Sequence, residues 1–156
     1  MEFSDIEDAE LVIIAGQSWF LSPSIPLQSF FLDGRVRSYL HNRDVIFVNA
    51  CRNMWLMTAR QIKSYTREIG ARLVGHIVFQ DNHKNLISAL TIVRWLMFNE
   101  KGSNFLLPEA GVSKKDIDSA RCFGNVISDA YANNTVDNLQ EELLKKGAIG
   151  GGNRPS

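Results

Sequence analysis

The sequence predicts a single α/β domain built around a parallel sheet. Three continuous apolar runs lack the alternation of half-exposed strands, and such runs are typical of strands that helices cover on both faces. Helical patterns separate the runs, and this alternation of strand and helix favours parallel strands. The length of 156 residues suits one ordinary domain. The strands are expected at residues 11–15, 45–50 and 73–79, with four or five helices.

The first run, LVIIAG, begins at Leu11 and is closed by Gly16. A loop rich in serine and proline follows. Pro26 is placed to open a helix, because proline is favoured in the first helical turn. Asp33-Gly34 is expected to break that helix, so that only the first part of the segment 27–40 is helical.

The second run is VIFVNA, and Asn53 is placed to cap the helix that follows it. Apolar residues of that helix recur mainly at spacings of three and four as far as Ile69. Gly70 is expected to end the helix, because a left-handed residue commonly follows a helix. The third run, ARLVGHIVFQ, contains Gly75, which is a candidate bulge.

The most apolar stretch is NLISALTIVRWLMF, at 85–98, and it is too short to cross a bilayer, which needs about 20 residues. It is expected to be a core helix, or a helix that also packs on a second subunit. Two amphipathic helices are expected after it, one following Ser113 and one over 136–146. The domain is expected to cover 1–149, with 150–156 as a flexible tail.

Composition excludes several classes of protein. With 45% hydrophobic and 22% charged residues the chain is not generally disordered. Because 17 basic residues balance 17 acidic ones, no nucleic-acid partner is expected. The 2 cysteines make no disulfide framework, and the sequence lacks a secretory pattern, so a cytoplasmic location is expected. Walker A, GxGxxG, HExxH and CxxC motifs do not occur, which leaves no support for the enzymes that use them.

The first candidate binding loop, GQSWFLSPSIP, follows the first strand. Ligands of open α/β sheets bind at the carboxyl ends of strands. Trp19 or Phe20 could therefore stack on a planar ring, while Ser18 and loop amides supply hydrogen bonds. The alternative is that both aromatic side chains fold back onto the core.

The second candidate loop follows the second strand. Backbone amides at Arg52–Met54 would suit an anion or an electron-rich ring edge. Cys51 could be a nucleophile, although no neighbouring His or Asp supports this, and an inert thiol is the alternative. Trp55 is expected to pack between helix and sheet.

Gln80, Asp81, Asn82 and His83 follow the third strand, where a His–Asp pair could do acid–base work. A solvated turn explains these residues equally well. His41 and His76 are isolated in the sequence, and each is expected to be structural or exposed.

The segments LVIIAGQSWFLSPSIPLQSFF and VIFVNACRNMWLMTARQIKSY resemble the second half of flavodoxin-like FMN proteins. CRNMWLM, TIVRWL and LLPEAGVS are similar to a branch of that superfamily labelled dialkylresorcinol condensing enzyme. The resemblance covers about residues 5–149 and implies a flavodoxin-like three-layer sandwich. It implies FMN as cofactor, with the isoalloxazine ring held by two sets of residues. These are Gly16, Gln17, Ser18, Trp19 and Phe20, and Ala50, Cys51, Arg52, Asn53, Met54 and Trp55.

One feature of the family has no match here, because no T-x-T-G-x-T phosphate loop stands before Leu11. The chain is therefore expected to begin just before the family's third strand and to bind FMN weakly or not at all by itself. In the strand order 2-1-3-4-5 this leaves residues 11–15 as an open edge. A partner chain or a second copy is expected there or on helix 86–98.

The function implied by the resemblance is that of an FMN-dependent oxidoreductase, of the kind that uses NAD(P)H, or of an electron-transfer protein. An alternative is an accessory protein of dialkylresorcinol or aryl-polyene lipid biosynthesis, acting by protein contact without redox chemistry. A truncated product without function is a third alternative.

Overall fold

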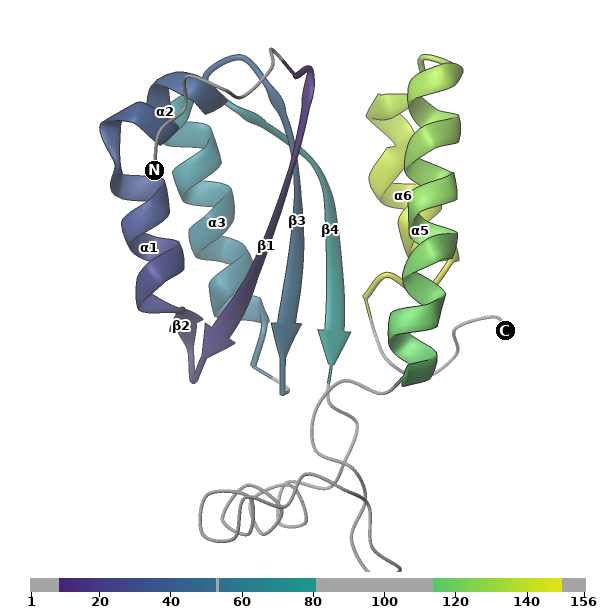
Figure 1. Ribbon diagram of the computed structural model, residues 1–156, viewed down its shortest axis with the longest axis horizontal. Helices are drawn as coiled ribbons and strands as arrows, with labels where there is room; N and C mark the ends of the chain where they lie inside the picture. The colour runs from purple at the N-terminus through teal and green to yellow at the C-terminus, as the bar shows by residue number, and fades with distance from the viewer. Residues whose placement is uncertain (1–8, 53, 81–113, 150–156) are drawn as a thin grey trace, which may run out of the picture.

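The computed structural model describes residues 9–52, 54–80 and 114–149 and shows an α/β fold in three layers. The central sheet contains β1 (Leu11–Trp19), β3 (Asp44–Cys51) and β4 (Arg72–Gln80), together with the short strand β2 (Ser22–Pro23). Figure 1 shows α1 to α3 on one side of the sheet and α5 and α6 on the other. The predicted α/β class with a mainly parallel sheet is therefore confirmed.

The sheet has the order β2-β1-β3-β4, in which β1, β3 and β4 are parallel and β2 is antiparallel to β1. The expectation of three strands missed β2, and the first strand continues past residue 15 to Trp19. A tight turn at Phe20 and Leu21 folds β2 back on the end of β1. This continuation was not predicted because the apolar run ends before Gln17. The Gln17 side chain is exposed, so the strand can carry a polar residue there.

The segment expected to be helical only in its first part forms two helices, α1 (Ile25–Leu32) and α2 (Gly34–Leu40). Asp33 ends α1 and then caps α2, because its carboxylate accepts a hydrogen bond from the backbone N–H of Arg35 at 2.8 Å. The Asp-Gly pair therefore restarts the helix in a new direction instead of ending helical structure. Each helix buries two side chains against the sheet, namely Leu27, Phe31, Val36 and Leu40.

The helix α3 (Leu56–Ile69) ends at Gly70, which has the predicted left-handed conformation with φ of 79°. Its start differs from the prediction, because the residue at the N-cap is Trp55 and no side chain caps the helix. Asn53, the predicted cap, lies outside the described residues. Arg52 and Met54, whose backbone amides were expected at the start of the helix, therefore precede it.

Two hydrophobic cores lie on the two faces of the sheet. The core beneath α1 to α3 is centred on Phe31, Phe47 and Ile62, each fully buried. The other core joins the sheet to α5 (Lys114–Ala132) and α6 (Leu139–Lys145). The predicted last helix is a 3₁₀ turn at Val136–Asn138 followed by α6.

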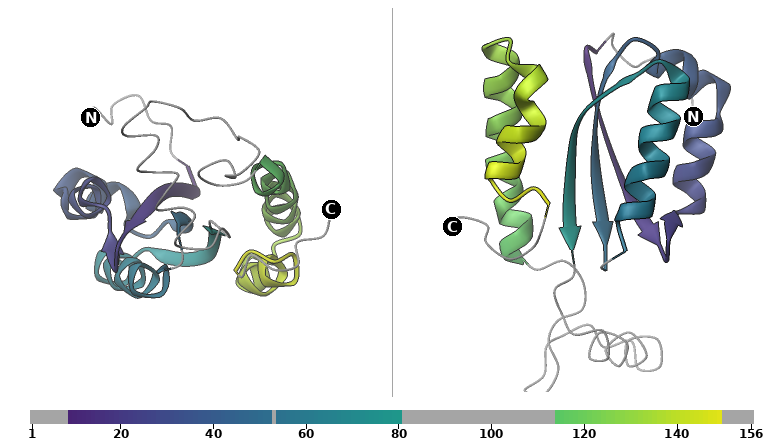
Figure 2. Two further views of the ribbon diagram at one scale, coloured as in Figure 1. Left: turned by 90° about the horizontal axis from the view of Figure 1, so that it is seen from below. Right: turned by 180° about the vertical axis from the view of Figure 1, so that it is seen from behind.

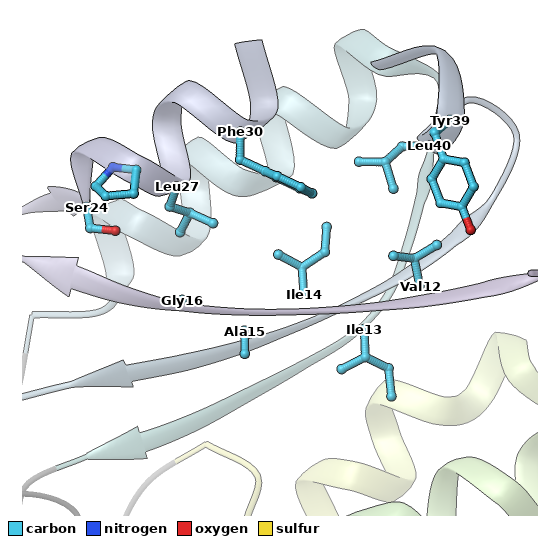
Figure 3. Close-up of a pocket in the computed structure, with 11 residues that line it drawn as sticks. Val12, Ile13, Ile14, Ala15, Gly16, Ser24, Leu27, Phe30, Tyr39 and Leu40 are labelled. Atoms are coloured by element: carbon cyan, nitrogen blue, oxygen red, sulfur yellow. The ribbon is translucent and has the colours of Figure 1, made fainter. Parts of the chain in front are cut away.

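The layer of α5 and α6 leaves part of β1 uncovered. In contrast to the buried faces of β3 and β4, Ile13 of β1 is 55% exposed and points toward the side of α5 and α6 (Figure 3). Figure 2, seen from below, shows α5 and α6 on the side of β4 rather than beneath β1. Within the described residues, β1 thus has an open edge and one open face.

The amino ends of the strands are tied to α5 by a charged cluster. The Arg72 guanidinium binds both carboxylate oxygens of Asp44, at 2.7 and 2.9 Å, and the Tyr131 hydroxyl donates to the same carboxylate at 2.9 Å. The hydrogen bonds from Arg72 hold the pKa of Asp44 below its ordinary value. This cluster lies at the end of the sheet opposite to the candidate binding loops.

No helix in the described ranges is both long and apolar enough to span a bilayer. The predicted helix 86–98 lies outside those ranges, as do Ser113 and the tail 150–156.

Candidate functional site

The structure brings the first two predicted loops together at the carboxyl edge of the sheet. In the parallel register of β1 and β3, Gly16 lies opposite Asn49 and Gln17 lies opposite Ala50. The end of β4 joins the same edge, because Cys51 is paired with Gln80. The residues after Gln80 that were predicted to contribute, Asp81–His83, lie outside the described residues.

A buried polar cluster fastens the end of β1 to its neighbours. The Ser18 hydroxyl lies 3.1 Å from Asn49 Oδ1, to which it donates, and 2.8 Å from the Thr58 hydroxyl. Asn49 and Thr58 are fully buried. Asn49 Nδ2 has no hydrogen-bond partner among the described residues, which is unusual for a buried amide.

Sequence reasoning found Ser18 and missed both of its partners. The one signal for Asn49 is an amide placed inside the apolar run VIFVNA, close to the end of the strand. Thr58 gives no signal, because its role depends on the way that α3 packs against β1.

The turn after β1 presents two aromatic side chains to solvent. Trp19 is 51% exposed and Phe20 is 79% exposed, so neither folds back onto the core. The Trp19 indole N–H donates to Gln17 Oε1 at 3.2 Å, which orients the ring. Phe20 has a φ of 59°, a left-handed conformation that bulky residues seldom adopt.

The loop after β3 is more enclosed than the first. Cys51 is buried, and burial raises the pKa of its thiol to about 11, so the thiol is protonated at neutral pH and is a poor nucleophile. Arg52 is half-buried and Met54 is exposed. Trp55 packs edge-on against the ring of His76, with 5.8 Å between ring centroids, so it acts in packing as expected.

His76 lies beneath this loop, inside the fold. Its ring stacks on Phe47 with 5.5 Å between centroids, and its backbone N–H donates to Gln140 Oε1 at 2.6 Å. Burial lowers the pKa of His76 to about 4, so the imidazole is neutral at physiological pH. The packing therefore agrees with the structural role expected for this histidine.

A separate apolar groove of about 480 Å³ runs along the open edge of β1. Figure 3 shows Val12 and Ile14 of β1 facing Leu27 and Phe30 of α1 across it. A side chain at Gly16 would meet Leu27, since a Cβ there would lie 2.7 Å from Leu27 Cδ2. This groove lies beside the strand and is distinct from the loops at its carboxyl end.

No protein-family model matches this chain, and no curated protein matches it either. Within 9–52, 54–80 and 114–149, no group of three or more His, Cys, Asp or Glu side chains is placed to hold a metal ion.

Proposed function

We propose that this chain contains the flavin-ring site of a flavodoxin-like FMN protein, either an oxidoreductase or an electron carrier. The observation that supports this most is the arrangement of the two loops at the carboxyl edge. The exposed ring of Trp19 stands beside a polar cluster at the ends of two parallel strands. Planar ligands of open α/β sheets bind in that position.

The residues present fit the ring of FMN better than its phosphate. Trp19 and Phe20 offer aromatic surface, and Ser18 and the backbone near Ala50 offer polar groups. A phosphate dianion needs several oriented donors, such as a nest of backbone amides. Within the described residues we identify no such nest at this edge. The bound flavin would supply the redox chemistry, and the protein would hold and orient its ring.

We expect the chain to bind FMN no more tightly than a dissociation constant of about 1 μM. That affinity requires roughly 8 kcal/mol. Stacking on one ring adds only about 0.5–1.5 kcal/mol beyond the area that it buries. Riboflavin, which lacks the phosphate, should bind within about twofold of FMN if the ring alone is recognised. Isothermal titration with both flavins measures this.

Matched variants distinguish the loss of the stacking ring from the loss of any exposed apolar side chain. Trp19→Ala is expected to weaken both flavins by roughly tenfold, because it removes the stacking face. Leu32→Ala removes a similarly exposed apolar side chain at the other end of α1 and should have no effect. Arg52→Ala should weaken the binding of FMN, because it removes a positive charge beside the proposed site. If Trp19→Ala binds each flavin as tightly as the parent chain does, the proposed site is refuted.

The open edge of β1 favours a second candidate function, that of an accessory protein that works by protein contact. The strand segment 11–16 has no partner on its outer side among the described residues, and it carries no charged residue that would discourage pairing. The apolar groove beside it would suit side chains of an added strand.

A charge at this edge should prevent such pairing. If the edge pairs with a second copy, the parent chain is expected to run above its monomer mass of 17.6 kDa in size-exclusion chromatography with light scattering. Ile13→Lys should restore the monomer without unfolding it, because Ile13 is more than half exposed. A parent chain that is a stable monomer at all concentrations would exclude self-association at this edge.

A further inference from the structure

Exposed apolar side chains gather at one end of the molecule, around the turn between β1 and β2. We call them the tip patch, and each is between 40% and 79% exposed. Its members are Trp19, Phe20, Leu21, Ile25, Met54, Leu56 and Met57. Scattered exposed hydrophobic residues are normal in proteins, but a contiguous group marks an interaction surface.

The tip patch comes from three parts of the chain, which are the turn after β1, the start of α1 and the residues around the start of α3. Two contacts bring these parts together. The backbone N–H of Ser24, next to Ile25, donates to the carbonyl of Gln17 at 2.9 Å. The Thr58 hydroxyl, in the first turn of α3, lies 2.8 Å from that of Ser18. Figure 1 accordingly shows the turn after β1 and the starts of α1 and α3 at the same lower end of the described fold.

The described chain segments that carry the tip patch contain charges of one sign only. Segments 16–26 and 49–63 contain Arg52, Arg60 and Lys63 and no acidic residue. The Arg60 guanidinium lies 3.9 Å from Met57 Sδ, so one of these cations borders the patch directly. An apolar surface with a positive border is complementary to a partner whose apolar interior is bordered by negatively charged groups.

The conformation of Phe20 keeps its ring in solvent. This bulky residue has a left-handed backbone at the first position of the tight turn, an unfavourable conformation for it, and its side chain is 79% exposed. Its ring therefore gains little from the core to offset that strain. The turn therefore presents an apolar ring in solvent beside the other residues of the tip patch.

We propose that the tip patch docks on the surface of an anionic lipid bilayer. Its aliphatic and aromatic side chains enter the boundary between headgroups and acyl chains, where tryptophan is favoured. Arg60, whose guanidinium borders Met57, lies toward the lipid phosphates and contributes electrostatic attraction. A bilayer explains both the apolar character of the patch and the single sign of charge in the described segments that carry it. The inference goes beyond the proposed flavin site and does not require flavin.

The test is cosedimentation of the 156-residue chain with vesicles, without flavin. Vesicles of phosphatidylcholine with about one third phosphatidylserine should bind the chain at least about tenfold more tightly than pure phosphatidylcholine. Added salt should weaken the binding, because it screens the attraction. Absence of binding, or equal binding to both vesicles, would overturn the proposal.

Variants outside the proposed flavin set locate the contact. The double change Leu21→Gln and Ile25→Gln should weaken vesicle binding by at least roughly tenfold. Arg60→Gln should weaken it by roughly fivefold. Leu32→Gln, at the far end of the helix that begins with Ile25, is the matched control and should bind normally.

Phe20→Gly separates folding from docking. Glycine accepts the left-handed conformation, so this variant should be at least as stable as the parent while it binds vesicles more weakly. If Leu21→Gln with Ile25→Gln instead abolishes self-association and the parent ignores vesicles, the patch is an interface between copies and the membrane proposal is wrong.

Discussion

Acidification from neutral pH to about 4 is expected to lower the free energy of unfolding by about 3 kcal/mol through His76 alone. Burial lowers the pKa of this histidine from 6.5 to about 4, so the unfolded chain binds a proton more readily than the folded chain. Stability therefore falls as the pH drops below 6.5 and levels off near 4, while above 6.5 it does not depend on this group.

Urea unfolding at pH about 7 and about 4.5 measures the effect. His76→Leu is expected to flatten the dependence on pH, because it removes the titrating ring from its place between Phe47 and Trp55. It also removes Nε2, a buried nitrogen with no partner in the described part of the chain. An unchanged slope in this variant would show that other groups titrate in this range.

The strands could be predicted from sequence because their physical cause is local. β3 is apolar from Val45 to Val48, since both of its faces meet helices, and this local pattern is enough to predict a buried strand. The conformation of Gly70 could be predicted equally well, because a glycine after a helical pattern commonly takes the left-handed conformation found there. These signals lie within a few residues of the structure that they specify.

The errors arise where two local signals compete. Asp33 and Gly34 are typical of a break, and the chain does turn there, but Asp33 also caps a new helix. The Ser and Pro residues after β1 are typical of a loop, yet Ser22 and Pro23 pair with the end of that strand. Pro23 is tolerated in β2 because this strand lies at the edge of the sheet.

The candidate site depended on contacts that sequence patterns do not contain. The loops were expected at one edge because parallel strands end together, and the register of β1 and β3 places them there. The hydrogen bonds of Ser18, by contrast, join residues 31 and 40 positions apart. Their partners can be identified only when the packing of α3 on the sheet is known.

Asn49→Asp is expected to destabilise the protein by roughly 4 kcal/mol at neutral pH, because a carboxyl group there must take up a proton or remain a buried charge. Its pKa in the folded state is raised, so stability should be retained below the ordinary carboxyl pKa and lost as the pH rises. That sign is opposite to the effect of His76. Asn42→Asp, the same change at an exposed residue, should shift stability by less than about 0.5 kcal/mol.

Asn49→Leu should behave differently, since it removes the unpaired Nδ2 while Ser18 keeps its contact with Thr58. Replacing a poorly satisfied buried amide by an apolar group is expected to change stability by no more than about 1 kcal/mol. Urea unfolding of both variants decides between these outcomes, and equal losses would mean that packing at this position outweighs polarity. A stable Asn49→Leu protein then gives a folded chain in which flavin titration shows whether the amide contributes to ligand binding, independently of any role in folding.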